Sequence, residues 1–177
     1  MKQGFVKVAS ATPRIRVADP VYNAQVICEQ AKEAAEHGAK IVVFPELCIT
    51  GYTCNDLFLQ ELLLEKAKEA LLTIAEETGQ LETLFLVGLP VDKDGRLYNV
   101  AAVLYRGRIL GMIPKKNIPM YAEFYEGRHF TPGEETVTEY RLGKQVIPFG
   151  SNLLFRCEEL PEPVSYTHLT LPTSDLV

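Results

Sequence analysis

Residues 41–46 read Ile-Val-Val-Phe-Pro-Glu, and this stretch decides the fold class of the chain. Its first four residues form a continuous apolar run, which is typical of a strand covered on both faces. Pro45 ends the run, because proline cannot donate a hydrogen bond to a neighbouring strand. Glu46 then lies at the carboxyl end of the strand, where α/β sheets commonly place groups that handle ligands.

A strand and a helix are predicted before this stretch. Residues 5–9 alternate between apolar and polar side chains, as a half-buried strand does. Asp19 and Pro20 supply an N-cap and a first-turn proline for a helix whose apolar stripe extends to Ala35, and Gly38 supplies its end. The expected order is therefore strand, helix and buried strand.

A second helix and three further strands are predicted after it. The helix covers residues 58–78, and strands are expected at 84–89, 98–105 and 109–113, with turn-forming residues at 92–95. The apolar face of this helix comprises Leu59, Leu62, Leu63, Ala67, Ala70, Leu71, Ile74 and Ala75. This order predicts a layered α/β or α+β domain, in which two helices cover the parallel start of the sheet.

Composition is that of one soluble globular domain. The 177 residues, of which 47% are hydrophobic and 23% charged, suffice for a single sizeable core. The formal net charge of -5 gives no reason to expect nucleic acid as a partner. No run reaches the roughly 18 apolar residues that span a bilayer, and the N-terminus does not resemble a signal peptide, so we expect a cytoplasmic protein without a membrane partner.

The four cysteines match neither a metal clip nor a compact disulfide framework, so reduced thiols and no metal site are expected. Cys28 lies on the apolar stripe of the first helix, and we interpret it as a small core residue. Cys48 and Cys54 lie in the loop around Glu46, where packing is the expected role.

Two charged residues are candidates for chemistry. Glu46, partly shielded from water at a strand end, could act as a general base. Lys115 follows a predicted strand and precedes a segment dense in polar and aromatic residues, and it could stabilise an oxyanion if a carboxylate holds it. On these residues alone, a solvated loop glutamate and an exposed solubilising lysine stay open as alternatives.

Two longer motifs carry a family resemblance. Residues 44–52 match the pattern F-P-E-x-x-x-x-G-Y, and residues 115–130 match K-x-x-[LI]-P-x-x-x-E-F-x-E-x-R-x-F. Both patterns resemble those of the nitrilase, or carbon-nitrogen hydrolase, superfamily, and the match extends from residue 5 to about residue 161. Residues 51–58 and Tyr121 resemble the bacterial branch formed by glutamine-dependent NAD+ synthetases.

The resemblance implies a role for each matching residue. Glu46 would be the general base, Lys115 the transition-state stabiliser, Glu123 a supporting carboxylate near the lysine, and Tyr121 part of the glutamine pocket. Lys116 is the rival lysine, but only Lys115 has the spacing of the family pattern. The implied fold is an incomplete α-β-β-α sandwich with these residues at one end of the sheet.

The family chemistry is covalent. A cysteine thiolate attacks the side-chain amide of glutamine, ammonia leaves, and water hydrolyses the thioester to glutamate. The implied partners are glutamine and a C-terminal synthetase domain, missing from this chain, that uses ATP and magnesium to convert deamido-NAD to NAD. A homo-oligomer is implied for the full-length protein, and no cofactor is implied for this domain.

The nucleophile of the family lies in a segment similar to G-V-x-I-C-E-D-x-W, which this sequence lacks. Cys157 is a poor substitute, because no buried strand leads into it. We therefore interpret residues 1–163 as a partial glutaminase domain that is inactive alone. Residues 164–177 resemble translated sequencing-adaptor DNA and are expected not to be native.

Two other functions stay open. A free-standing amidase of the same superfamily would share both motifs. A catalytically silent binding module would keep the sandwich without the nucleophile, although missing strands would leave an unpaired sheet edge that invites aggregation.

Overall fold

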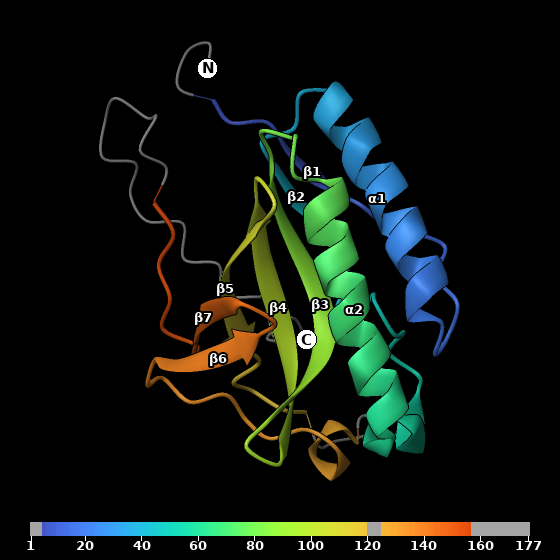
Figure 1. Cartoon of the computed structure of the whole chain (residues 1–177), viewed down its shortest axis with the longest axis vertical. Helices are drawn as coiled ribbons and strands as arrows, with labels where there is room; N and C mark the ends of the chain where they lie inside the picture. Colours follow the sequence, from blue (N-terminus) through green and yellow to red (C-terminus); the bar gives the residue numbers. More distant parts are fainter. Residues whose placement is uncertain (1–4, 120–124, 157–177) are drawn as a thin grey trace.

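The computed structural model describes residues 5–119 and 125–156 (Figure 1). One sheet of seven strands has the order β1-β2-β3-β4-β5-β7-β6, and two helices lie side by side on one of its faces. In chain order the elements are β1 (Val8–Ser10), α1 (Pro20–Glu36), β2 (Ile41–Val43), the 3-10 helix η1 (Asn55–Leu59), α2 (Glu61–Glu77), β3 (Leu84–Lys93), β4 (Arg96–Tyr105), β5 (Arg108–Pro114), the 3-10 helix η2 (Glu126–Arg128), β6 (Thr138–Leu142) and β7 (Gln145–Phe149). The predicted layered α/β class is confirmed, and the described residues form one helical and one sheet layer of the expected sandwich.

The strand directions bring three chain segments to one end of the sheet. β1, β2 and β3 pair in parallel, and β3, β4 and β5 then form the predicted antiparallel meander. β5 consequently has the same direction as β2. The carboxyl ends of β2 and β5 therefore lie at the same end of the sheet as the beginning of β4.

Helix α1 has the predicted boundaries. The Asp19 carboxylate accepts a hydrogen bond from the Tyr22 amide at 3.1 Å, and Pro20 is the first helical residue. Gly38, just beyond the last turn, has a φ of 81°, a left-handed conformation that glycine adopts without steric cost. Within residues 5–119 and 125–156, no helix is long and apolar enough to cross a membrane.

The second predicted helix is wrong in its first turn. Residues 58 and 59 belong to η1, and Gln60, with a ψ of 120°, is extended and separates η1 from α2. The buried face of α2 begins at Leu63, whereas Leu59 and Leu62 are both exposed. Leu62 is 69% exposed, in contrast to its predicted place on the apolar face.

The first two strands also differ from the prediction. β1 covers residues 8–10 instead of 5–9, because β2 offers only three residues for pairing, from Ile41 opposite Val8 to Val43 opposite Ser10. β2 itself is fully covered on one face only. Val42 is buried, whereas Ile41 and Val43 are half-buried, so the expectation of a strand covered on both faces is wrong.

The hairpin β6–β7 was not predicted. Its buried residues, Tyr140 and Leu142 in β6 and Ile147 and Phe149 in β7, alternate with more exposed ones as in a half-buried strand pair, and Tyr140 lies opposite Ile147. Pro148 obscured this pattern, because a proline argues against a strand. The hairpin extends the sheet beyond β5 through the parallel pairing of β7.

The main core lies between the helices and the sheet. Its fully buried members include Ile27 from α1 and Leu71 and Ile74 from α2. On the opposite sheet face, a Cβ at Gly111 would lie 2.9 Å from the side chains of Leu153 and Phe155. Leu153 and Phe155 therefore pack closely against this second face.

The helical core gives a first prediction. Leu71→Ala should lower the free energy of unfolding by about 2–5 kcal/mol, because it removes buried methyl groups and leaves a cavity. Leu62→Ala, in the same helix but exposed, should change it by no more than about 0.5 kcal/mol. Urea unfolding of both variants measures the difference, and equal losses would contradict the burial of Leu71 and the exposure of Leu62.

Candidate active site

Glu46 is placed by a tight turn that crosses β3. Leu47, the next residue, is buried and has a φ of 51°, an uncommon conformation for a residue with a side chain. The turn lies against Gly88, where a Cβ would be only 2.4 Å from the Leu47 nitrogen and 2.7 Å from the Pro45 carbonyl oxygen. The missing side chain at Gly88 therefore allows the close approach that fixes the backbone at Glu46.

Lys115 is placed by the ladder between β4 and β5. Its amide donates to the carbonyl oxygen of Asn99 at 2.8 Å, immediately beyond the pairing of Val100 with Pro114. Residues opposite each other in an antiparallel pair project to the same face of the sheet. Asn99 and Lys115 thus lie next to each other, at the sheet end that also carries Glu46.

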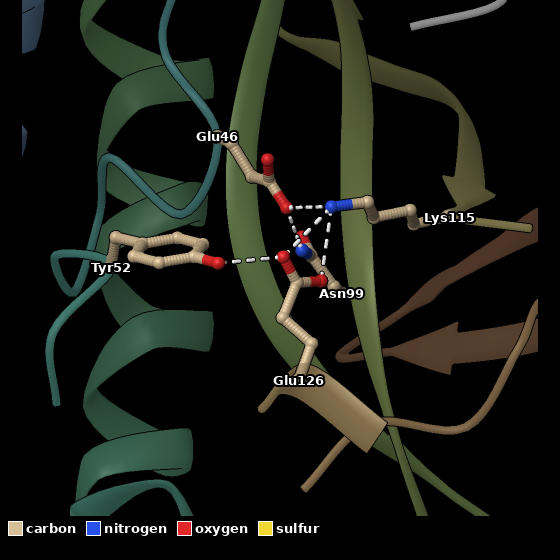
Figure 2. Close-up of polar contacts among 5 residues, drawn as sticks. All are labelled: Glu46, Tyr52, Asn99, Lys115 and Glu126. Carbon is tan, nitrogen blue, oxygen red and sulfur yellow. Dashed lines mark hydrogen bonds and ion pairs between the residues drawn. The ribbon is translucent and has the colours of Figure 1, made fainter. Parts of the chain in front are cut away.

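The lysine ammonium lies between two carboxylates (Figure 2). Lys115 Nζ is 2.8 Å from Glu46 Oε1, 2.9 Å from Glu126 Oε1 and 3.0 Å from Glu126 Oε2. The side chains of Lys115 and Glu126 are 9% and 5% exposed, whereas that of Glu46 is 38% exposed. Glu46 is therefore the carboxylate that solvent or a ligand can reach.

Two uncharged groups complete the arrangement. The Asn99 side-chain amide donates to Glu46 Oε1, the oxygen that also accepts from Lys115. The Tyr52 hydroxyl donates to Glu126 Oε1 at 2.7 Å. Each carboxylate is thus held by Lys115 and by one neutral donor.

The carboxylates keep the lysine charged. Burial favours the neutral amine, but the hydrogen bonds and charges of Glu46 and Glu126 outweigh burial and raise the pKa of Lys115 above its ordinary value. The three contacts to carboxylate oxygens match the three hydrogens of an ammonium group. Two carboxylates and one ammonium give this cluster a formal charge of about -1 at neutral pH.

The segment that carries Glu126 is also tied to η1. Asp56, in η1, lies 3.2 Å from Arg128 and 3.1 Å from the His129 ring. The His129 ring packs edge-on against Phe58, with centroids 6.0 Å apart. These contacts connect the turn after Glu46 to η2 and so help to hold Glu126 below Lys115.

The structure brings together two of the four predicted site residues, Glu46 and Lys115. The rival Lys116 is exposed and pairs with Glu135 instead. Tyr121 and Glu123 lie outside the described residues. The carboxylate that supports the lysine in the described part is Glu126.

Sequence reasoning assigned no role to Glu126, Asn99 or Tyr52. Glu126 belongs to the second motif and Tyr52 to the first, so a signal was present for both. Asn99 stands as a polar residue within the apolar run of β4, where a buried amide needs a hydrogen-bonding partner. Its partner could not be identified from the sequence, because Glu46 is far away along the chain.

The described cysteines are free and buried, as predicted. Burial raises the pKa of Cys28 to about 11 and that of Cys48 to about 12, and it also raises the pKa of Cys54. The Cys48 thiol lies 3.6 Å from the Gly88 carbonyl oxygen, and Cys54 contacts the carbonyl oxygen of Thr50. None of the three has the surroundings of a reactive thiolate.

The described residues form a layered α/β domain with a lysine between two glutamates at one end of its sheet. Residues 7–153 match the family described as carbon-nitrogen hydrolase, and the chain belongs to this family. The predicted family resemblance is thereby confirmed.

The relatives are longer proteins. The glutamine-dependent NAD(+) synthetase of Mycobacterium tuberculosis is 39% identical over 160 residues, which cover 90% of this chain and 24% of that protein. The Mycobacterium leprae synthetase is 37% identical over 158 residues, covering 89% and 23%. A crystal structure of the Cytophaga hutchinsonii synthetase superimposes with a TM-score of 0.81 at 28% identity, covering 86% of this chain and 26% of that chain. This chain therefore spans about a quarter of the length of these relatives.

The ammonium between two carboxylates gives a second prediction. Lys115→Met leaves the buried Glu126 without its counter-charge, and it should lower the free energy of unfolding by about 3 kcal/mol. Lys116→Met removes an exposed charge and should change it by less than about 1 kcal/mol. Urea unfolding at neutral pH compares the two, and equal effects would show that Lys115 is not held as described.

The buried thiols give a third prediction. Alkylation requires the thiolate, and with pKa values of about 11 and 12 very little of Cys28 and Cys48 is ionised between pH 7 and 9. Peptide mapping after treatment of the folded protein with iodoacetamide should find both cysteines unmodified, whereas both react in urea. Rapid native labelling of Cys48 at pH 7.5 would contradict its burial.

Proposed function

We propose that this chain provides the acid–base groups of a glutaminase, which hydrolyses the side-chain amide of glutamine. The observation that carries the proposal is the 2.8 Å contact between Lys115 Nζ and the accessible Glu46 carboxylate. A carboxylate can accept and return a proton, and a fixed ammonium can stabilise the negative charge that develops on a carbonyl oxygen. The names of the relatives support glutamine over the substrates of a free-standing amidase.

The charge of the site supports an amide as substrate. A glutamine side chain is neutral, and its amide nitrogen can donate a hydrogen bond to an oxygen of Glu46. A glutamate side chain would bring a third carboxylate to a cluster that already has a formal charge of about -1, and like charges at short range repel. The site should therefore bind glutamine in preference to glutamate.

The proposed reaction has two halves. A cysteine thiol gives its proton to Glu46, its sulfur bonds to the amide carbon, and the C–N bond breaks as Glu46 returns the proton to the leaving nitrogen. Water then attacks the thioester, Glu46 takes a proton from it, and the C–S bond breaks as Glu46 returns this proton to the sulfur, which releases glutamate and restores the thiol. Lys115 would stabilise the oxyanion in both halves, and it needs no change of protonation to do so.

The three described cysteines do not suit the thiol role in this proposal. Cys28, Cys48 and Cys54 are buried, and the pKa of each thiol is raised. The remaining cysteine of the chain, Cys157, lies outside the described residues. We retain the sequence-based prediction that Cys157 is not the nucleophile and that this chain alone does not turn over glutamine.

Two predicted residues keep their roles as part of the proposal. Tyr121 would line the glutamine pocket and Glu123 would support the lysine, although Glu126 already holds Lys115 in the described part. In the longer relatives, whose names couple glutamine to NAD+ synthesis, ammonia from such a domain would serve an ATP-dependent, magnesium-requiring conversion of deamido-NAD to NAD. We extend this role to the protein to which the chain belongs.

Glutamine binding tests the proposal and is the fourth prediction. In a thermal shift or calorimetric titration, L-glutamine should bind the chain and raise its melting temperature, because a ligand of the folded state stabilises it. L-glutamate should bind at least about tenfold more weakly, which corresponds to about 1.4 kcal/mol of repulsion. Equal binding of both amino acids, or of neither, would refute the proposal.

Matched lysine variants make this titration specific. Lys115→Met should weaken L-glutamine binding, because it removes the ammonium that would contact the carbonyl oxygen of the ligand, whereas Lys116→Met should leave binding unchanged, because Lys116 pairs with Glu135 away from the site. Ammonia release measured with the same proteins tests the role of the cysteines. Steady release that is lost in Glu46→Gln and in Cys157→Ala would overturn our prediction and identify Cys157 as the nucleophile.

A further inference from the structure

Asn99 connects the two charged residues of the site. It lies in β4 and is only 3% exposed. Its backbone carbonyl oxygen accepts from the Lys115 amide at 2.8 Å, and its side chain donates to Glu46 Oε1. One buried residue therefore sets the position of Lys115 through its backbone and that of Glu46 through its side chain.

The orientation of the Asn99 amide follows from chemistry. An ionised carboxylate can only accept hydrogen bonds, so the amide group must turn its nitrogen toward Glu46. The opposite orientation would place two acceptors against each other. Asn99 is thus a directed donor and does more than fill space between strands.

The two carboxylate oxygens of Glu46 differ in their hydrogen bonds. Oε1 accepts from both Asn99 and Lys115, which together use the two lone-pair sites of a carboxylate oxygen. Oε2 accepts no hydrogen bond from any residue in the described part of the chain, and Figure 2 shows it directed away from the other four side chains. Because Glu46 is partly exposed, Oε2 is the oxygen that a ligand can reach.

We propose that Asn99 is a positioning residue that holds Glu46 by Oε1, so that Oε2 alone exchanges protons with the substrate. This inference rests on the proposed general-base role of Glu46. Lys115 alone would hold Oε1 by one contact and would leave the carboxylate free to rotate about its terminal bond. With both donors in place, the proton taken from the thiol goes to Oε2 and passes from there to the leaving nitrogen.

Two substitutions of similar shape test the contact and form the fifth prediction. Asn99→Leu removes the donor, and Asn99→Asp replaces it by a second carboxylate beside Glu46. Two carboxylates that share a site bind one proton more tightly when folded than when unfolded. The stability deficit of Asn99→Asp should therefore be small at pH 5, where the pair is protonated and one oxygen can donate, and large at pH 8.

The expected result is a pH-dependent shift in one variant only. The urea midpoint of Asn99→Asp should lie about 1 M below that of the unchanged protein at pH 8 and recover at pH 5, whereas Asn99→Leu should show an equal deficit at both pH values. Equal, pH-independent deficits in both variants would overturn the inference, since they would show that position 99 does not act on Glu46.

A double variant with donor and acceptor exchanged serves as a control for single variants that fail to fold. Glu46→Gln combined with Asn99→Asp restores a hydrogen bond with donor and acceptor exchanged, and it should recover most of the stability lost in Asn99→Asp alone at pH 8. No recovery would count against the contact. This comparison needs no ligand, so it judges Asn99 even if the protein proves not to bind glutamine.

Titration with L-glutamine measures a binding affinity, which should not change if Asn99 has a purely structural role. Folded Asn99→Leu should bind L-glutamine roughly tenfold more weakly than the unchanged protein, because the acceptor oxygen is no longer held in place. Unchanged affinity in a folded Asn99→Leu would overturn the positioning role. Failure of the unchanged protein to bind would instead refute the proposed function.

Discussion

The structure of this site depends on one buried ammonium group between two carboxylates. Lys115 and Glu126 are both almost inaccessible to solvent, and neither charge would be tolerated there without the other. This pair is neutral overall, so the formal negative charge of the cluster is that of Glu46, which is the more exposed carboxylate. A fixed cation beside an accessible carboxylate is an arrangement suited to moving a proton next to a developing oxyanion.

The sheet supplies the rigidity that this ammonium requires. Glu46 follows the carboxyl end of β2, which is parallel to β3. Because β3, β4 and β5 are successively antiparallel, β5 ends at the same end of the sheet, where Lys115 follows it. Gly88 in β3 admits the turn that carries Glu46, and Asn99 in β4 contacts both charged residues. The helices lie on one face of the sheet and contribute the core rather than the chemistry (Figure 1).

Much of this fold could be predicted from local patterns. The caps of α1, the run that forms β2 and the turns of the β3–β5 meander are local signals, and each gave the correct element. The break at Gln60 was missed because no glycine or proline marks it, and the β6–β7 hairpin was missed because Pro148 argued against a strand. Glu46 and Lys115 could be predicted from motif spacing, whereas the contacts of Asn99 and Glu126 depend on strand register and on long-range packing, which the sequence does not reveal.

A crystal structure of the chain with L-glutamine bound is the most direct test of this site. We expect the side-chain carboxamide next to Glu46 Oε2 and Lys115 Nζ, with its nitrogen toward the glutamate, while Asn99 keeps its contact with Oε1. Glutamine bound away from this sheet end, or bound with the contacts of Glu46 broken, would contradict the central claim that the clamped lysine and glutamate form an amide site.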